Sequence, residues 1–128
     1  MEFTREGFYL LLNSPKPLWL VGADLSRAEL RWANLYGANL IRVDFSGADL
    51  RWANLAKSRL VGAKLIGASL REANMREADM RWADLHRADM EAADLSGANL
   101  LGANVTEAQL SRARSLEGAV LPDGAERA

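Results

Sequence analysis

The chain of 128 residues contains no cysteine, and this absence excludes several kinds of site. No disulfide framework, thiolate nucleophile or cysteine-bound zinc or iron–sulfur centre can form. The single histidine, His86, leaves few ways to build a catalytic triad or a metal cluster. We therefore expect a protein that is not an enzyme and that holds no cofactor and no metal.

Neither sign of charge predominates, because 16 basic and 17 acidic side chains leave a formal net charge of −1. A protein that binds nucleic acid through its phosphates normally carries a basic excess, and a protein that imitates nucleic acid carries an acidic one. The balance predicts a partner other than nucleic acid.

Long apolar runs are also missing. The best candidate, residues 8–12, is much shorter than the roughly 20 residues that a membrane-spanning helix needs. The mixed charges of Glu2, Arg5 and Glu6 before it are unlike the basic start of a signal peptide. We expect a cytoplasmic protein that has no membrane partner.

What the chain does contain is a period of five residues. Residues 21–110 divide into 18 consecutive pentapeptides without insertion, beginning VGADL, SRAEL, RWANL and YGANL. The third residue is Ala in 16 of the 18, the fourth is Asp or Asn in 13, and the fifth is always apolar. A repeat this strict indicates a solenoid of stacked units.

This period excludes both a continuous helix and a continuous strand. At about 100° per residue, a helix would spread the apolar fifth positions around its whole circumference. An uninterrupted strand would place them alternately on its two faces. Both conflicts disappear if each unit is a short extended segment followed by a turn, with the third and fifth side chains pointing inward. Four such units predict one coil of 20 residues.

The tandem A(D/N)LXX motif resembles the pentapeptide repeat family over residues 21 to about 120. The resemblance implies an all-β fold, a right-handed quadrilateral β-helix whose fifth and third positions fill the core. Met75, Met80 and Met90 occupy fifth positions, and we expect them to be core residues.

The ends of a solenoid need caps, because they expose core and unpaired backbone. We expect residues 1–20 to form an N-terminal cap, which consists of a short helix that begins near Thr4 and a segment that leads into the first coil. Residues 21–110 then form about 4.5 coils, residues 111–122 the last partial coil and C-terminal cap, and residues 123–128 a frayed tail.

Two predictions concern the corners and the outer columns. The second position of the repeat is glycine in some units and Arg, Trp, Glu or Lys in others. The turn type should therefore vary along the rod. Asn34, Asn54 and Asn74 fall in one exterior column, which predicts a ladder of side-chain amide hydrogen bonds.

Trp32 and Trp52 lie 20 residues apart, so their rings should stack outside the core. Exposed Trp and Arg side chains dominate the energetics of many interfaces. The candidate partner-binding surface is therefore this pair with the neighbouring arginine column, namely Trp32, Trp52, Arg31, Arg51 and Arg71. The alternative is that repeat duplication copied RWANL and that the pair only shields a turn.

The opposite corner predicts a second contact surface, a weakly charged apolar strip. Its members are Val21, Ile41, Val61, Trp82 and Leu101. This strip, or an end of the solenoid, could form a homodimer. The alternative is that solenoid corners tolerate apolar residues without any function.

The family resemblance implies one specific activity, because members that confer resistance to gyrase poisons resemble DNA and are strongly acidic. The repeats here contain 11 basic and 12 acidic residues, and no side of the rod has a net charge beyond −2. A DNA-mimic inhibitor or protector of bacterial DNA gyrase is thus the disfavoured alternative. We expect a non-enzymatic protein-binding or scaffold module with an unidentified protein partner; a spacer that acts through self-association is a third possibility.

Overall fold

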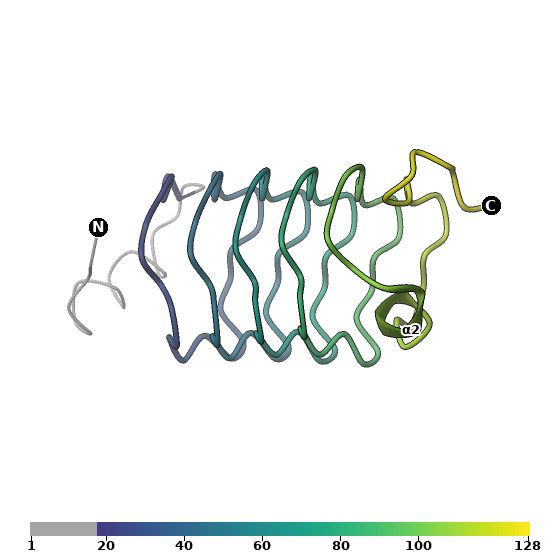
Figure 1. The fold of residues 1–128 in the computed structure, drawn as a ribbon. Helices are drawn as coiled ribbons and strands as arrows, with labels where there is room; N and C mark the ends of the chain where they lie inside the picture. The colour runs from purple at the N-terminus through teal and green to yellow at the C-terminus, as the bar shows by residue number, and fades with distance from the viewer. Residues whose placement is uncertain (1–17) are drawn as a thin grey trace.

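The structure is a computed structural model that describes residues 18–128. From Leu18 the chain winds into a rod of stacked coils (Figure 1). Bridging residues pair in parallel with residues 20 positions later, from Trp19 with Asn39 to Asp84 with Asn104. A turn follows every fifth residue, so each coil has four short sides. This is the β-helix type of solenoid that the repeat predicts.

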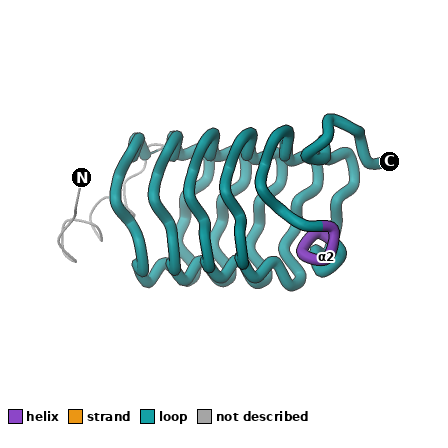
Figure 2. Tube along the Cα trace, viewed as in Figure 1, coloured by secondary structure: helices purple, strands orange, loops and turns teal. Residues whose placement is uncertain are grey.

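The described residues contain no strand longer than a single bridging residue, which is why Figure 2 draws the coils as loops. A pentapeptide provides only a short extended segment before the next corner turns the chain. The predicted N-terminal helix lies outside the described residues, and the right-handed sense of the coil stays a prediction.

The core is filled by the third and fifth positions, as predicted. Phe45, Leu50 and Leu65 are fully buried, and so are the alanines that stand two residues before Leu65 and Leu100. Met75, Met80 and Met90 are each at most 1% exposed, which confirms them as core residues. Burial of this apolar ladder is the main favourable contribution to folding.

Every corner from residue 22 to residue 102 uses the same backbone conformation, so the prediction of varying turns is wrong. The second residue of each repeat has φ between 55° and 70°, although only seven of these residues are glycine. A positive φ at the third residue of a four-residue turn is the mark of type II. The ten other corner residues are Arg27, Trp32, Arg42, Trp52, Lys57, Glu72, Glu77, Trp82, Arg87 and Ala92.

Hydrogen bonds hold these left-handed corners, as the one at Lys57 illustrates. Its amide donates to Arg76 O of the next coil at 2.9 Å, and the Ser58 amide donates to Leu55 O at 3.1 Å. The Ala56 amide donates to Asn54 Oδ1 at 3.1 Å. The side chain at the fourth position therefore caps the corner that follows it, which explains why Asp and Asn recur there.

The same capping bond forms after Asp or Asn in twelve repeats. The acceptors are Asp24, Asn34, Asn39, Asp44, Asp49, Asn54, Asn74, Asp79, Asp84, Asp89, Asp94 and Asn99. The Oδ1 atoms of Asn34, Asn54 and Asn74 thus accept backbone hydrogen bonds instead of forming the predicted amide ladder.

The eighteenth pentapeptide leaves the coil, because residues Glu107–Leu110 form the short helix α2. Thr106 Oγ1 accepts from the Gln109 amide at 3.1 Å, and Gln109 Oε1 accepts from the Thr106 amide at 2.9 Å, which completes a capping box. In a regular coil the backbone amide of Gln109 would donate to Ala88 O, as that of Asn104 donates to Ala83 O. In the helix the Gln109 side chain makes this bond instead, because its Nε2 donates to Ala88 O at 3.1 Å.

The helix changes the register by one residue. Asp94 pairs with Ser115 and Asn99 with Val120, a spacing of 21 instead of 20. The tail beyond residue 122, which we expected to fray, instead turns back, and Glu126 pairs antiparallel with Val120. Figure 1 shows this segment in yellow at the end of the rod. It covers one backbone edge of the last coil.

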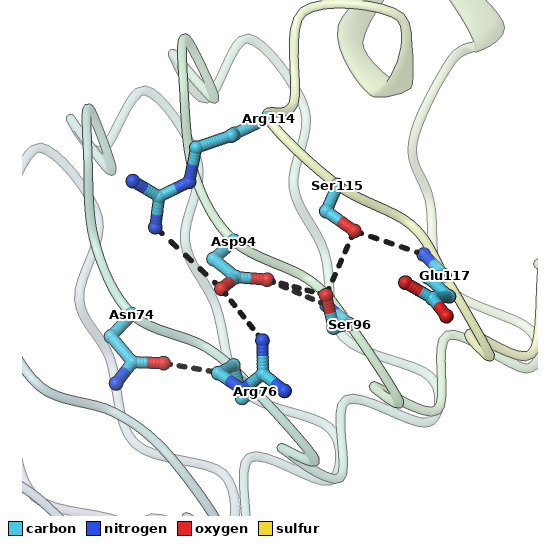
Figure 3. Close-up of polar contacts among 7 residues, drawn as sticks. All are labelled: Asn74, Arg76, Asp94, Ser96, Arg114, Ser115 and Glu117. Carbon is cyan, nitrogen blue, oxygen red and sulfur yellow. Dashed lines mark hydrogen bonds and ion pairs between the residues drawn. The ribbon is translucent and has the colours of Figure 1, made fainter.

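A polar cluster around Asp94 joins the shifted coil to the regular one (Figure 3). Asp94 Oδ1 accepts from Ser96 Oγ at 2.7 Å, and Asp94 Oδ2 lies 3.1 Å from Arg76 Nη1 and 3.6 Å from Arg114 Nη2. The hydroxyl oxygens of Ser96 and Ser115 are 2.8 Å apart. Burial alone raises the pKa of Asp94, but the bonds from Ser96 and the charge of Arg76 outweigh it, and the pKa lies below its usual value.

The corner conformation predicts opposite effects for two neighbouring alanines. Ala92 has φ 58°, a left-handed conformation that costs a residue with a side chain about 1–2 kcal/mol. Glycine avoids this cost, which is larger than the entropy that glycine loses on folding, so Ala92→Gly should stabilise the protein. Ala93 is fully buried and its φ is not left-handed, so Ala93→Gly should destabilise by about 1–2 kcal/mol. Denaturant unfolding followed by circular dichroism should place the Ala92→Gly midpoint above wild type and that of Ala93→Gly below it. Equal losses in both variants would contradict the corner argument.

The Asp94 cluster predicts a dependence of stability on pH. Because its folded-state pKa is lowered, Asp94 stabilises fully above its unfolded pKa of about 3.9, and this stabilisation is lost as the pH falls through the folded value. Asp94→Asn should cost about 1–3 kcal/mol at pH 7 and less near pH 3. Unfolding measured at both pH values, with the exposed Glu117→Gln as control, would contradict the prediction if the loss did not shrink in acid.

Candidate partner-binding site

The indole rings of Trp32 and Trp52 form a stack on the outside of the rod. Their centroids are 4.9 Å apart and their planes differ by 10°. Trp52 Nε1 donates to Glu72 Oε2 at 3.0 Å, so the next corner of the same column anchors the second ring. Trp32 is 71% exposed. The stack therefore presents one well-positioned aromatic ring to solvent.

Side chains at the corners lean toward the following coil, and this direction explains the stack. A Cβ added at Gly62 would lie 3.3 Å from Arg42 Cγ, and one added at Gly102 would clash with the Trp82 ring. Trp32 likewise leans on the ring of Trp52 in the following coil. The ring face that points away from Trp52 is left without an aromatic partner in the described part of the chain.

The three arginines of the predicted column are aligned in the backbone, since the Trp32 amide donates to Arg51 O and the Trp52 amide to Arg71 O, both at 3.1 Å. Their guanidinium groups do not stack on one another. Arg31 lies 3.2 Å and Arg51 2.7 Å from the same oxygen of Asp49. Arg71 pairs with Asp89 at 3.3 Å, and Asp89 stands two coils after Asp49 in the same column, so this pair repeats that of Arg31 with Asp49. Each predicted arginine is therefore held by a carboxylate.

Asp49 is the electrostatic centre of this corner. The side-chain hydrogen bonds from Arg51 outweigh partial burial and hold the pKa of Asp49 below its usual value, and Arg31 adds to the effect. The Arg51 guanidinium also lies 5.6 Å from the centre of the Trp52 ring, within the range of a cation–π interaction. These contacts hold the arginines and the stacked rings in one arrangement.

The predicted apolar strip also forms a column. Val21, Ile41 and Val61 are half-buried, and Leu101 is 36% exposed. Trp82 is 63% exposed and lies flat over Gly102. The returning tail reaches the end of the strip, because a Cβ added at Gly124 would lie 3.6 Å from Leu101 Cδ1. The strip is therefore more covered than Trp32, and Arg81 interrupts its column between Val61 and Leu101.

Two exposed aromatic residues were missed by the sequence analysis. Trp19 is 75% exposed and Tyr36 is 48% exposed, and both lie near the N-terminal end of the described rod. Trp19 precedes the first recognisable pentapeptide, so the repeat alignment left it out. Counting back 20 residues from Asn39 would have placed it in the same column.

In residues 18–128, no group of three or more His, Asp or Glu side chains is arranged to hold a metal ion. No helix in that same range is long and apolar enough to cross a membrane.

Comparison with known proteins agrees with the repeat. The family model for pentapeptide repeats matches residues 23–60, 53–91 and 83–122. Among curated proteins, no match to the chain was found. One similar solved structure is that of HetL from the cyanobacterium Nostoc sp. strain PCC 7120, a protein involved in the regulation of heterocyst differentiation. HetL is 30% identical to this chain, and the TM-score is 0.45. The match covers 87% of this chain and 67% of HetL.

A second solved structure is similar in fold. QnrB1, a plasmid-mediated fluoroquinolone resistance protein, is 21% identical with a TM-score of 0.52, and the match covers 79% of this chain and 61% of QnrB1. The chain therefore spans about two thirds of the length of these relatives. With its repeats, its coil and the family match over most of its length, the chain belongs to the pentapeptide repeat family.

Proposed function

We propose that the protein is a non-enzymatic module that binds another protein through the corner formed by Trp32, Trp52, Arg31 and Arg51. The observation that carries this proposal is the stacked Trp pair, with one ring 71% exposed. An indole held in place by a second indole and by an ion-paired arginine loses little conformational freedom on binding. Preorganised Trp and Arg side chains are the usual centres of binding energy at protein interfaces.

Shielding of the turn is a weaker explanation for the pair. The corner at Gly67 has the same left-handed φ, 67°, and within the described residues no side chain lies over it. A corner of this kind therefore needs no indole to shield it, and shielding does not account for a stacked pair with one ring largely exposed.

DNA mimicry finds no support in the surface. The likeness to QnrB1, at 21% identity, concerns the fold alone. A DNA mimic requires long acidic rows, whereas here Arg31 and Arg51 share Asp49, Arg71 pairs with Asp89, and Arg81 pairs with Asp79 at 2.8 Å. Carboxylates neutralised in this way do not imitate a phosphate backbone.

The proposal predicts that removal of both rings abolishes binding while the fold remains. Quantitative affinity capture from cells that contain the native partner should recover a protein with wild type and at least tenfold less with Trp32→Ala/Trp52→Ala. Trp82→Ala is the matched control, because it removes an exposed corner Trp from the opposite corner and should capture normally. Normal capture by the double variant, with unchanged circular dichroism, would refute the proposal.

The charge argument predicts the result of a supercoiling assay. DNA gyrase should supercoil relaxed plasmid at the same rate with and without micromolar protein, and a fluoroquinolone should stabilise the same amount of cleaved DNA. Inhibition or protection by the wild-type protein would instead establish the DNA-mimic function.

A further inference from the structure

On two adjacent sides of the rod, the charged residues are segregated along its axis. Residues 31–40 and 51–60 form two adjacent sides in consecutive coils, since Asn34 pairs with Asn54 and Asn39 with Arg59. All four charged residues in these two segments are basic: Arg31, Arg51, Lys57 and Arg59. The continuation of the same two sides, residues 71–80 and 91–100, contains five acidic and only two basic residues. Each of these two sides has a total charge close to zero, but it is basic toward the N-terminal end of the rod and acidic toward the C-terminal end.

Three of the four exposed aromatic residues, Trp19, Trp32 and Tyr36, lie at the basic end, and Trp82 lies at the opposite corner. Trp19 stands one coil before Asn39 and two coils before Arg59 in one column, and Tyr36 begins the side that holds Asn39. The Trp32–Trp52 stack stands at the other edge of the adjacent side. We call this set the basic aromatic surface: Trp19, Arg31, Trp32, Tyr36, Arg51, Trp52, Lys57 and Arg59.

Two of its cations remain available for a partner. Arg59 is exposed and forms no ion pair within the described residues, although Asp79 stands one coil after it in the same column. Hydrogen bonds from Arg81 are the main cause of the lowered pKa of Asp79, and the charge of Arg59 adds to them without a direct contact. Lys57 is 56% exposed, and its Nζ lies 3.9 Å from Glu77, at the limit of an ion pair in water. Arg31 and Arg51 are already bound to Asp49 and position the rings. The free positive charge therefore lies beside the aromatic side chains.

We infer that the partner presents an acidic segment with aromatic or other apolar side chains, and that this segment lies across the basic aromatic surface. The inference rests on the proposed function and names the chemistry of its partner. Aspartate and glutamate would meet Lys57 and Arg59, while apolar side chains would contact the open face of Trp32 and the rings of Trp19 and Tyr36. Charge complementarity of this kind guides association and sets orientation.

Nucleic acid fits the surface less well, although its phosphates are also acidic. Asp49 already neutralises Arg31 and Arg51, so Lys57 and Arg59 are the two cations of this surface left for acidic groups. A nucleic acid carries one phosphate per nucleotide and binds through a longer row of cations than two. A protein segment with a few acidic side chains needs no more than these two.

The test uses a fluorescein-labelled peptide in which Asp and Glu alternate with Phe, a second peptide with Lys in place of the acids, and a labelled single-stranded oligonucleotide. Fluorescence anisotropy with the full chain should show that the acidic peptide binds at least tenfold more tightly than the other two. Lys57→Gln/Arg59→Gln should weaken acidic-peptide binding about fivefold to tenfold, and raised salt should weaken it further.

The matched control is Arg42→Gln/Arg87→Gln, which removes the same charge from two exposed corners outside the surface and should leave binding unchanged. Equal binding of both peptides, an equal loss in the control, or tighter binding of the oligonucleotide would overturn the inference. If no peptide binds while affinity capture still depends on Trp32 and Trp52, the proposed function stands and only the partner chemistry is wrong.

Discussion

The left-handed corner is the constraint on which the rest of the rod depends. A five-residue side can close into a coil only if each corner turns the chain sharply, and here every regular corner does so with a positive φ. At non-glycine residues this conformation is unfavourable. Hydrogen bonds hold it. At Lys57 one comes from the preceding Asn side chain, one crosses the turn and one reaches the next coil. The corners at Trp32 and Glu72 follow Glu29 and Ser69, lack the side-chain bond and keep the two backbone bonds.

The uniform corners produce straight columns, and the columns determine the surface. Because each corner side chain leans toward the following coil, the identity of the residue 20 positions later decides what it contacts. Trp32 meets another indole, Trp52 meets a glutamate, and Trp82 meets bare glycine backbone. Three tryptophans with the same backbone conformation therefore have three different environments. This is the reason why the Trp32 corner and the apolar strip differ as candidate sites.

Much of the fold could be predicted from the repeat, because a strict period leaves few geometries that bury every Leu and Ala. The positions of the core residues and the Trp32–Trp52 stack follow from counting in fives and twenties. The partners of the arginines were not predicted. Asp49 and Asp89 belong to one column on the side next to that of Arg31 and Arg71, 18 residues later in the chain, and counting in twenties does not reveal contacts between different columns. The net charge of each side also gave no sign that two of the sides are basic at one end and acidic at the other, because the two ends cancel in the sum.

The sequence by itself determined the period, the core, the columns and the absence of cysteine chemistry, since these depend only on residue identity and spacing. Only the tertiary structure decided the uniform corners, because corners with and without a capping Asp or Asn form the same backbone hydrogen bond across the turn. It also decided the shift to 21 residues after α2 and the return of the tail. These depend on which backbone groups the last regular coil leaves unpaired, and Gln109 satisfies one of them with its side chain.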